Sequence, residues 1–301
     1  MKRKILCFII IFSAFISNNS KAQYFTLTDS LFRDLLVNQG LLSCINGMQL
    51  DTTCPALSSI ITLTVSNGQV RNIDGIKYLI NLEYLSCNSV PLDSLPELPP
   101  NLTELDCDFT FMIKFPQLPQ GILSFKAANN RFTTLPTLPS SLKILDVKNG
   151  MITGALNLPP NLESANCGRN GFTTVGNLPS SLIDFYIYEN QINSLPTLPA
   201  SLKTLSCGNN PMTSPLPVLP DSLETLSANQ CNLSVVPLLG SNLNTIHLKH
   251  NQLTTIDSFP LSATIIDISE NLLTTLPNIP ENVRRLYVSN NLLTSIPYIP
   301  D

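Results

Sequence analysis

The stretch NQINSLPTLPASLKTLSCGNN (residues 190–210) decides the fold, because the chain repeats it. The stretch opens and closes on Asn, carries prolines three positions apart, and then places Leu202 and Leu205 three positions apart. The stretch before it, NGFTTVGNLPSSLIDFYIYEN (residues 170–190), follows nearly the same pattern. Self-similarity at a fixed period of about 20–50 residues is the sequence signature of repeat architectures.

The period becomes clear when the repeats are aligned on one residue, usually leucine, that stands five positions before the Asn. We call this residue the anchor of its repeat. The step between these anchors is 20 residues, except for one step of 21 between Leu205 and Leu226, where Pro215 is the inserted residue. The first repeat is longer, because its anchor, Leu63, stands 22 residues before Leu85. The chain therefore contains about twelve coils. Their anchors are Leu63, Leu85, Leu105, Phe125, Leu145, Ala165, Phe185, Leu205, Leu226, Ile246, Ile266 and Leu286.

Each coil has two halves with different backbone preferences. The first half alternates apolar and polar residues around the anchor, as at Leu205 and Cys207, which is typical of a strand with one buried face. The second half reads L-P-x-L-P, and proline fixes φ, lacks an N–H donor and disfavours a helical residue before it. The return segment is therefore predicted to be extended and polyproline-like. The sequence predicts a mainly β protein built as a parallel β-solenoid.

The Asn at the end of each line is expected to lie inside a sharp turn. A buried amide can donate to and accept from the backbone groups that such a turn leaves in the interior. Val90, Thr110 and Gly150 replace this Asn in early coils and Cys231 in a later one, so the early coils are expected to have a looser ladder. The ladder asparagines are Asn130, Asn170, Asn190, Asn210, Asn251, Asn271 and Asn291.

These features resemble bacterial secreted leucine-rich-repeat proteins of the short, 20-residue L-P-x-L-P type, and the 22-residue line at Leu63 resembles an internalin-type repeat. The resemblance covers residues 60–301. It implies a curved parallel solenoid, the leucine-rich-repeat horseshoe, whose concave strand face binds other macromolecules, with a protein as the expected partner. Two alternatives remain open: the recognition domain of a larger effector enzyme of the ubiquitin-ligase type, and a glycan-binding adhesin.

The two ends of the chain differ from the repeats. Residues 1–22 combine a basic start, a short apolar run and a small-x-small end, which predicts a secretory signal peptide and a secreted or cell-surface protein. Residues 23–59 are expected to form an N-terminal cap with a short helix, SLFRDLLVNQ, that Thr28 or Asp29 caps. The solenoid, residues 60–301, is expected to lack a C-terminal cap, because the sequence stops in mid-coil.

The eight cysteines fall into groups once Cys7 is assigned to the signal peptide. Cys44 and Cys54 lie in the cap, outside the repeat register, and are predicted to form a disulfide in an oxidising compartment. Four others share one inward strand position that Ala, Val, Ile or Leu fills in other coils, so they are interpreted as core residues rather than metal ligands. These four are Cys87, Cys107, Cys167 and Cys207.

The sequence contains no catalytic or cofactor-binding pattern. With two histidines in total and no nucleophile motif, the protein is predicted to be non-enzymatic and to need no cofactor. Glu104, Asp106 and Asp108 could hold Ca²⁺, but Lys126 follows Asp106 in the same column, so an exposed ion-pair ladder is preferred and no metal is predicted.

Charge and hydropathy exclude two classes of partner. Acidic residues outnumber basic ones by 21 to 17 and there is no basic cluster, which argues against nucleic acid. No apolar run is long enough for a transmembrane segment.

Binding is expected at the outward strand positions that flank each anchor. Most of them carry small residues, such as Ser206 and Ser227. The exceptions predict two candidate patches for a protein or glycan ligand, because exposed tyrosines are enriched in binding hot spots. The first patch is Asp184, Tyr186 and Tyr188, and the second is His247, Lys249, Arg285 and Tyr287.

Overall fold

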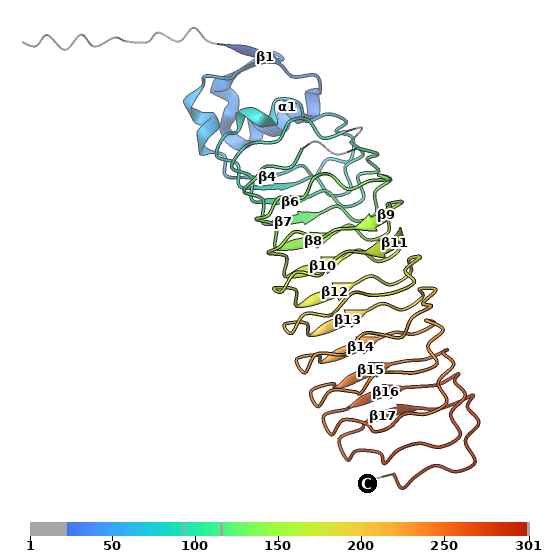
Figure 1. Ribbon diagram of the computed structural model, residues 1–301. Coiled ribbons are helices and arrows are strands. Elements are labelled where there is room, and N and C mark those ends of the chain that lie inside the picture. Colours follow the sequence, from blue (N-terminus) through green and yellow to red (C-terminus); the bar gives the residue numbers. More distant parts are fainter. Residues whose placement is uncertain (1–22, 93, 115–116, 300–301) are drawn as a thin grey trace, which may run out of the picture.

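The computed structural model describes residues 23–92, 94–114 and 117–299. They form one curved solenoid with a small cap at its N-terminal end (Figure 1). The parallel β-solenoid predicted from the repeat is confirmed, and so is the small amount of helix at its start. The predicted signal peptide, residues 1–22, lies outside the described residues.

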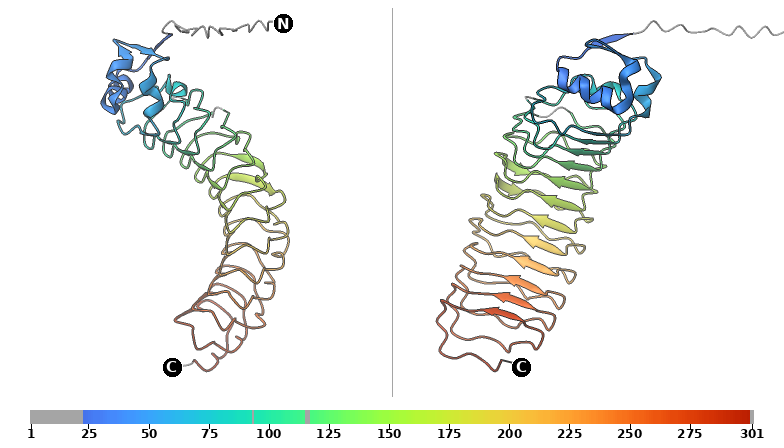
Figure 2. Two further views of the ribbon diagram at one scale, coloured as in Figure 1. Left: turned by 90° about the vertical axis from the view of Figure 1, so that its left-hand side faces the viewer. Right: turned by 180° about the vertical axis from the view of Figure 1, so that it is seen from behind.

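A parallel sheet of 12 strands runs along the concave side, with one short strand from each coil (Figure 2). The strands follow one another in chain order and in register, so that Leu205 pairs with Phe185 on one side and Leu226 on the other. Each anchor is the central residue of its strand and is buried in every strand except the last. The strands are β4 (Thr62–Thr64), β5 (Tyr84–Ser86), β6 (Glu104–Asp106), β7 (Ser124–Lys126), β8 (Ile144–Asp146), β10 (Ser164–Asn166), β12 (Asp184–Tyr186), β13 (Thr204–Ser206), β14 (Thr225–Ser227), β15 (Thr245–His247), β16 (Ile265–Asp267) and β17 (Arg285–Tyr287).

The asparagine ladder forms as the sequence predicts. The Asn210 amide nitrogen donates to the Ile187 and Cys207 carbonyls at 2.9 Å each, and its Oδ1 accepts from the Ile192 N–H at 2.9 Å. The other six ladder asparagines contact the corresponding backbone groups in the same way. Each one therefore joins two coils and satisfies backbone groups that face the interior.

The early ladder has fewer amide contacts, as expected from its sequence. Thr110 Oγ1 lies 2.9 Å from the Cys107 carbonyl and 2.7 Å from Asn130 Oδ1, so this hydroxyl replaces only part of the amide's contacts. Gly150 has no side chain to contribute, and a Cβ added there would stand 2.6 Å from Asn170 Oδ1.

The convex side is extended, but it is not polyproline-like throughout. There, β9 (Thr153–Leu156) and β11 (Gly171–Val175) pair as a two-stranded parallel sheet (Figure 1). Leu156 and Gly176 stand where other coils have the first proline of L-P-x-L-P, and the Gly176 N–H donates to the Leu156 carbonyl at 2.9 Å. Proline could not make this bond because it has no N–H. At these two coils the return segment is therefore a paired β-strand rather than the predicted polyproline-like path.

The N-terminal cap combines a three-stranded antiparallel sheet with short helical segments. Asp29, one of the two predicted residues, is the N-cap of α1. Its Oδ1 accepts hydrogen bonds from the N–H groups of Leu31 (2.9 Å) and Phe32 (3.0 Å). The cap elements are β1 (Tyr24–Thr26), α1 (Ser30–Leu36), a π-helical turn (Val37–Leu41), 3₁₀ helices at Leu42–Cys44 and Pro55–Ser59, β2 (Ile45–Asn46) and β3 (Gln49–Asp51). A further 3₁₀ helix, Ile76–Tyr78, lies in the first coil.

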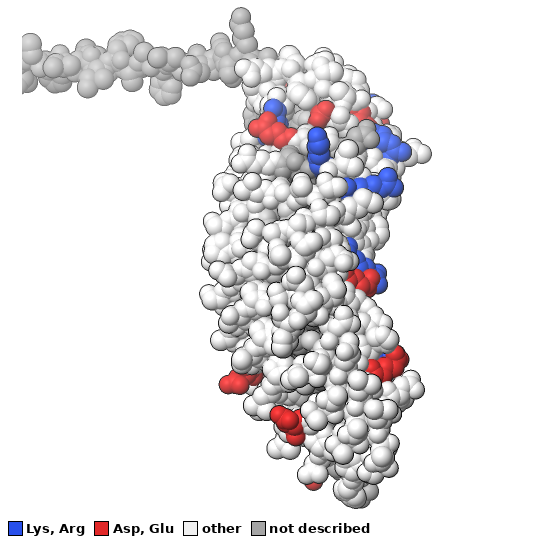
Figure 3. Space-filling model, turned by 45° about the vertical axis from the view of Figure 1, so that its right-hand side comes forward, with Lys and Arg blue, Asp and Glu red and all other residues white. Residues whose placement is uncertain are grey.

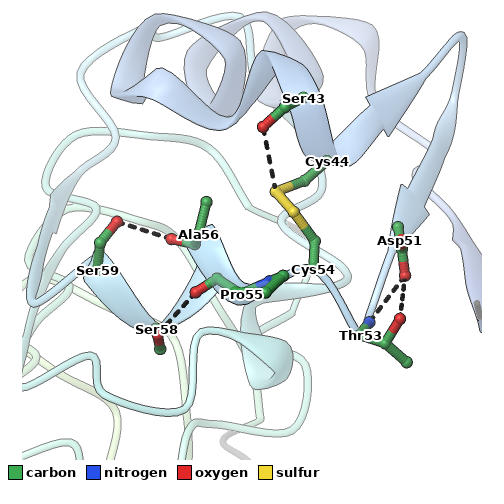
Figure 4. Close-up of a disulfide and its surroundings, with 9 residues drawn as sticks. All are labelled: Ser43, Cys44, Asp51, Thr53, Cys54, Pro55, Ala56, Ser58 and Ser59. Atoms are coloured by element: carbon green, nitrogen blue, oxygen red, sulfur yellow. Dashed lines mark hydrogen bonds between the residues drawn. A yellow bond between two sulfur atoms is a disulfide. The ribbon is translucent and has the colours of Figure 1, made fainter. Parts of the chain in front are cut away.

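Two contacts secure the cap. Cys44 and Cys54 form the predicted disulfide, with their Cα atoms 5.5 Å apart (Figure 4). Closing a loop between residues 10 positions apart stabilises a fold by about 2.5–3 kcal/mol in the chain-entropy description. Asp29 Oδ2 also accepts from the N–H groups of Arg71 (2.8 Å) and Asn72 (3.3 Å), which ties the start of α1 to the first coil.

Candidate functional site

The concave face consists of the residues that flank each buried anchor. Around β12 these residues are small: Ser164 and Asn166 on β10, and Thr204 and Ser206 on β13. Side chains of this size leave the backbone of the sheet close to solvent. A larger side chain on β12 therefore stands above its neighbours.

Asp184 and Tyr186 occupy the two outward positions of β12, on either side of buried Phe185. Burial raises the pKa of the Tyr186 hydroxyl and so does the charge of Asp184, while a hydrogen bond with Thr204 acts in the opposite direction. The hydroxyl is therefore neutral near pH 7. Tyr186 remains half-exposed.

Tyr188 lies across the preceding coil. A Cβ added at Gly168 would stand only 2.5 Å from two carbon atoms of the Tyr188 ring, so the ring covers the Gly168 backbone. Any other residue at position 168 would displace the ring. The half-exposed Tyr188 is therefore positioned before a ligand arrives, which reduces the entropy lost on binding.

The second predicted patch is divided by a strand. His247 lies on β15, whereas Arg285 and Tyr287 lie on β17. In the strand register Asp267 of β16 stands between His247 and Tyr287. The predicted patch did not include Asp267, although this residue follows its anchor at the same position as His247 and Tyr287 follow theirs. The first patch is therefore the more continuous aromatic surface.

Charged side chains of the solenoid pair locally. Lys249 of the second predicted patch forms an ion pair with Glu270 at 3.0 Å. Asp146 pairs with Lys148 at 3.2 Å, whereas the predicted ladder would have paired it with Lys126, which lies opposite it in the sheet. Exposed pairs of this kind contribute at most about 1 kcal/mol each. These ion pairs leave the charged groups less available to a ligand.

Hydrogen bonds hold the acidic residues of the β6 coil. Asp106 Oδ2 accepts from the Asn88 amide at 2.7 Å, and Asp108 Oδ1 accepts from the Ala128 N–H at 2.7 Å. Burial raises the pKa of the Asp108 carboxyl despite that bond. Over residues 23–92, 94–114 and 117–299, no group of three or more His, Cys, Asp or Glu side chains is placed to hold a metal ion.

Among the residues that the structure describes, five cysteines are free, and all five are buried. Burial raises the pKa of the Cys107 and Cys167 thiols. A thiolate is the form that attacks electrophiles and binds metals, so these environments disfavour both reactions. Cys107 and Cys167 therefore act as small core residues.

The remaining surface offers fewer distinctive features. Charged side chains are sparse over the middle of the face seen in Figure 3. Within the part of the chain that the structure describes, no helix has the length and apolar character needed to cross a membrane.

Comparison with known proteins identifies the fold. No protein-family model and no curated protein matches the chain. The solved structure of YopM, a leucine-rich effector protein from Yersinia pestis, is similar with a TM-score of 0.62 and 24% identity, over 90% of this chain and 89% of that one. A leucine-rich-repeat protein of Leptospira interrogans gives 0.61 and 24%, over 77% and 72% of the two chains.

A third solved structure is the functional domain of InlJ from Listeria monocytogenes. It is similar with a TM-score of 0.59 and 18% identity, over 91% of this chain and 73% of that one. The solenoid described above thus has the leucine-rich-repeat fold of these solved structures. At these identities the likeness extends to the fold and not to a shared ligand.

Proposed function

We propose that the protein is a secreted or surface-exposed, non-enzymatic leucine-rich-repeat protein that binds another protein through its concave face. The observation that carries the proposal is the pair Tyr186 and Tyr188, which stands on the sheet among small residues. Asp184 beside the pair supplies a single charge. The solenoid itself provides a broad rigid surface for a partner, which is the usual role of repeat proteins.

The chemistry of tyrosine supports a protein ligand. A tyrosine ring buries a large apolar area and its hydroxyl can form a hydrogen bond, so tyrosines are enriched among residues that dominate protein interfaces. Here the Tyr188 ring packs on the Gly168 backbone, so this side chain loses little conformational freedom on binding. The same rings could stack on a sugar, and the test below distinguishes the two ligands.

The proposed location rests on residues 1–22 and on the disulfide between Cys44 and Cys54. Disulfides persist in oxidising compartments and are rare in the cytosol. N-terminal sequencing of the native protein is expected to begin at Gln23. A native protein that retains residues 1–22 in the cytoplasm would contradict the proposed location.

The test compares wild-type protein with the double variant Tyr186→Ala/Tyr188→Ala on two arrays, one of purified proteins and one of glycans. We expect binding to at least one protein, weakened by about 10–100-fold in the double variant, because hot-spot residues contribute about 2 kcal/mol or more each. The melting temperature is expected to stay within a few degrees, since both side chains are half-exposed.

A matched control is Tyr24→Ala, which removes a tyrosine that is 61% exposed in the cap, away from the concave sheet. This control should bind as the wild type does. Equal affinity of the wild type and the double variant for every protein ligand would contradict the proposal. Binding to glycans alone would favour the adhesin.

A further inference from the structure

A second surface stands out on the edge where each strand turns toward the convex side. The fourth residue after every anchor from Leu85 to Leu286 has positive φ, between 52° and 59°. Ten of these eleven positions carry a polar or charged residue, and only Phe109 is apolar. Phe109 is nevertheless 49% exposed. Neither burial nor backbone preference explains a phenylalanine at this position, because bulky residues disfavour positive φ.

Phe111 repeats the anomaly two residues later. At this place in the coil positive φ occurs at only two residues of the described chain, Asn232 (55°) and Phe111 (61°). Both coils lack the ladder Asn and carry Thr110 or Cys231 in its place. Asn tolerates the left-handed conformation, whereas Phe does not gain from it. Phe111 is 54% exposed, so the unfavourable conformation holds an aromatic ring in solvent. An observed backbone outlier of this kind is a reason to look for a function.

Two further apolar side chains extend the surface. Ile113 is 62% exposed, and from the coil of Leu85 onward it is the only apolar residue in a column that otherwise holds Thr, Ser, Asn or Asp. Met151 is 58% exposed and lies two coils from Phe111 in the same column. Between these two coils stands Arg131, whose guanidinium carbon lies 5.4 Å from the centre of the Phe111 ring. We name these five residues the lateral patch: Phe109, Phe111, Ile113, Arg131 and Met151.

The charge at the lateral patch is positive. Arg131 is exposed and stacks on Phe111, which orients its planar fork of N–H donors, and the exposed Lys114 follows Ile113 directly. None of the five patch residues is acidic. A guanidinium held in this way binds a carboxylate with two parallel hydrogen bonds. The complementary ligand therefore combines apolar side chains with a carboxylate.

We propose that the lateral patch docks a segment of a partner protein in which apolar side chains stand beside an Asp or Glu. The apolar side chains would pack on Phe109, Phe111 and Ile113, and the carboxylate would pair with Arg131. An anionic membrane fits less well, because the chain carries 21 acidic against 17 basic residues and Arg131 is the only charged residue among the five of the patch. The proposal does not depend on the concave face, and Tyr186→Ala/Tyr188→Ala should leave it intact.

The first experiment asks whether the patch is needed for folding. In the double variant Phe109→Asn/Phe111→Asn both replacements suit positive φ, so we expect an unchanged or higher melting temperature. A fall of several degrees would show that the two rings stabilise the fold, and it would overturn the proposal. The matched control is Leu272→Asn, which removes an apolar side chain that is 45% exposed in the same column as Phe111.

The second experiment selects a phage-displayed random peptide library on the full wild-type protein, with depletion on the double variant. Enriched peptides are expected to combine Leu, Phe or Trp with Asp or Glu. Their synthetic forms should bind Phe109→Asn/Phe111→Asn about tenfold or more weakly than wild type, and Leu272→Asn as well as wild type. Arg131→Gln should weaken peptides that carry a carboxylate and leave their amide analogues unchanged.

Four outcomes would overturn the proposal. They are enriched peptides without a carboxylate, peptides that bind wild type and the double variant equally, loss of binding to phosphatidylserine vesicles in the double variant, and loss of self-association in that variant by sedimentation. The third outcome would assign the patch to a membrane and the fourth to a second copy of the chain.

Discussion

The N-terminal cap and the middle of the solenoid hold neighbouring segments together in different ways. In the cap each contact occurs once: the disulfide between Cys44 and Cys54, and the Asp29 carboxylate that joins α1 to the first coil. In the middle one contact recurs at successive levels, the buried amide of residues such as Asn190 and Asn210. The recurring contact is visible as a sequence pattern, and the disulfide could be predicted from the two cysteines outside the repeat, but the contact of Asp29 with the first coil could not.

The difference follows from the energetics of a stack. Ordering the backbone of one coil costs more than its own apolar side chains return, so a coil is stable only through its interfaces with neighbours. An interior coil has two such interfaces and can use the same contact at both. The first coil packs against the cap, which is not a repeat. This interface is therefore held by different contacts, such as the hydrogen bonds of Asp29. Removing a ladder Asn should therefore cost more than removing the Asp29 side chain from the cap.

The largest effect is expected for Asn251→Ala. This amide donates to the Ala228 carbonyl, and its Oδ1 accepts from the N–H groups of Cys231 and Leu233. The substitution leaves these buried groups without that partner, at about 1–3 kcal/mol for each group left unsatisfied. We expect a loss of about 3 kcal/mol in the free energy of unfolding, measured by urea denaturation.

The control for this prediction is the exposed Asn193, whose replacement by Ala should change the free energy of unfolding by less than about 0.5 kcal/mol. Equal losses for Asn251→Ala and Asn193→Ala would mean that the ladder does not stabilise the stack.

A smaller effect is expected for Asp29→Ala, about 1–2 kcal/mol, as for other helix caps. Burial raises the pKa of this carboxyl, but hydrogen bonds from the N–H groups of Arg71, Phe32, Asn72 and Leu31 outweigh it, so the pKa is lowered. A lowered pKa in the folded state means that the carboxylate stabilises the fold above the ordinary Asp pKa of about 3.9. That stability is lost as the pH falls through the folded-state pKa.

The pH dependence is the measurement for Asp29. Free energies of unfolding of wild type and Asp29→Asn should differ at pH 7 and converge once the pH has fallen below the lowered folded-state pKa of Asp29. A difference that stays constant from pH 7 to the acid limit would contradict the assigned role of the carboxylate.

The smallest effect is expected for Cys231→Asn, which restores a ladder amide. Cys231 Sγ lies 3.2 Å from the Cys207 carbonyl and is a weak donor. An amide at this position is expected to raise the free energy of unfolding by about 1 kcal/mol. Thermal denaturation measures it, with Cys231→Ala as the control that removes the donor. A Cys231→Asn variant less stable than Cys231→Ala would limit the ladder to coils without the 21-residue step.

Much of the fold could be predicted from the sequence, because each coil of a solenoid corresponds to one sequence repeat. Spacing alone placed the anchors, from Leu63 to Leu286, at the centres of the strands. The pairing of β9 with β11 was not predicted, because it depends on a backbone N–H that becomes available where Gly176 replaces proline. The sequence narrowed the helix N-cap to Thr28 or Asp29, and the hydrogen bonds from the N–H groups of Leu31 and Phe32 to Asp29 distinguish them.

The sequence could predict which residues of the candidate site lie on the concave face, but not how their side chains pack against neighbouring coils. The register places Asp184 and Tyr186 on one face, as expected from strand periodicity. The packing of Tyr188 on Gly168 joins two coils and depends on a rotamer that periodicity does not specify. The exposed Phe109 was missed for a different reason. Its signal, a single apolar residue in a polar column, was present in the sequence and needed only a comparison down that column.

The measurement that tests the proposed function most directly is site-specific photo-crosslinking to the protein ligand found on the array. A benzophenone amino acid is placed either at Ser206, opposite Tyr186 in the sheet, or at the exposed Thr197 on the convex side of the same solenoid. Binding through the concave face predicts a crosslink from position 206 and none from position 197. A crosslink from position 197 alone would contradict it and would move the binding surface to the convex side.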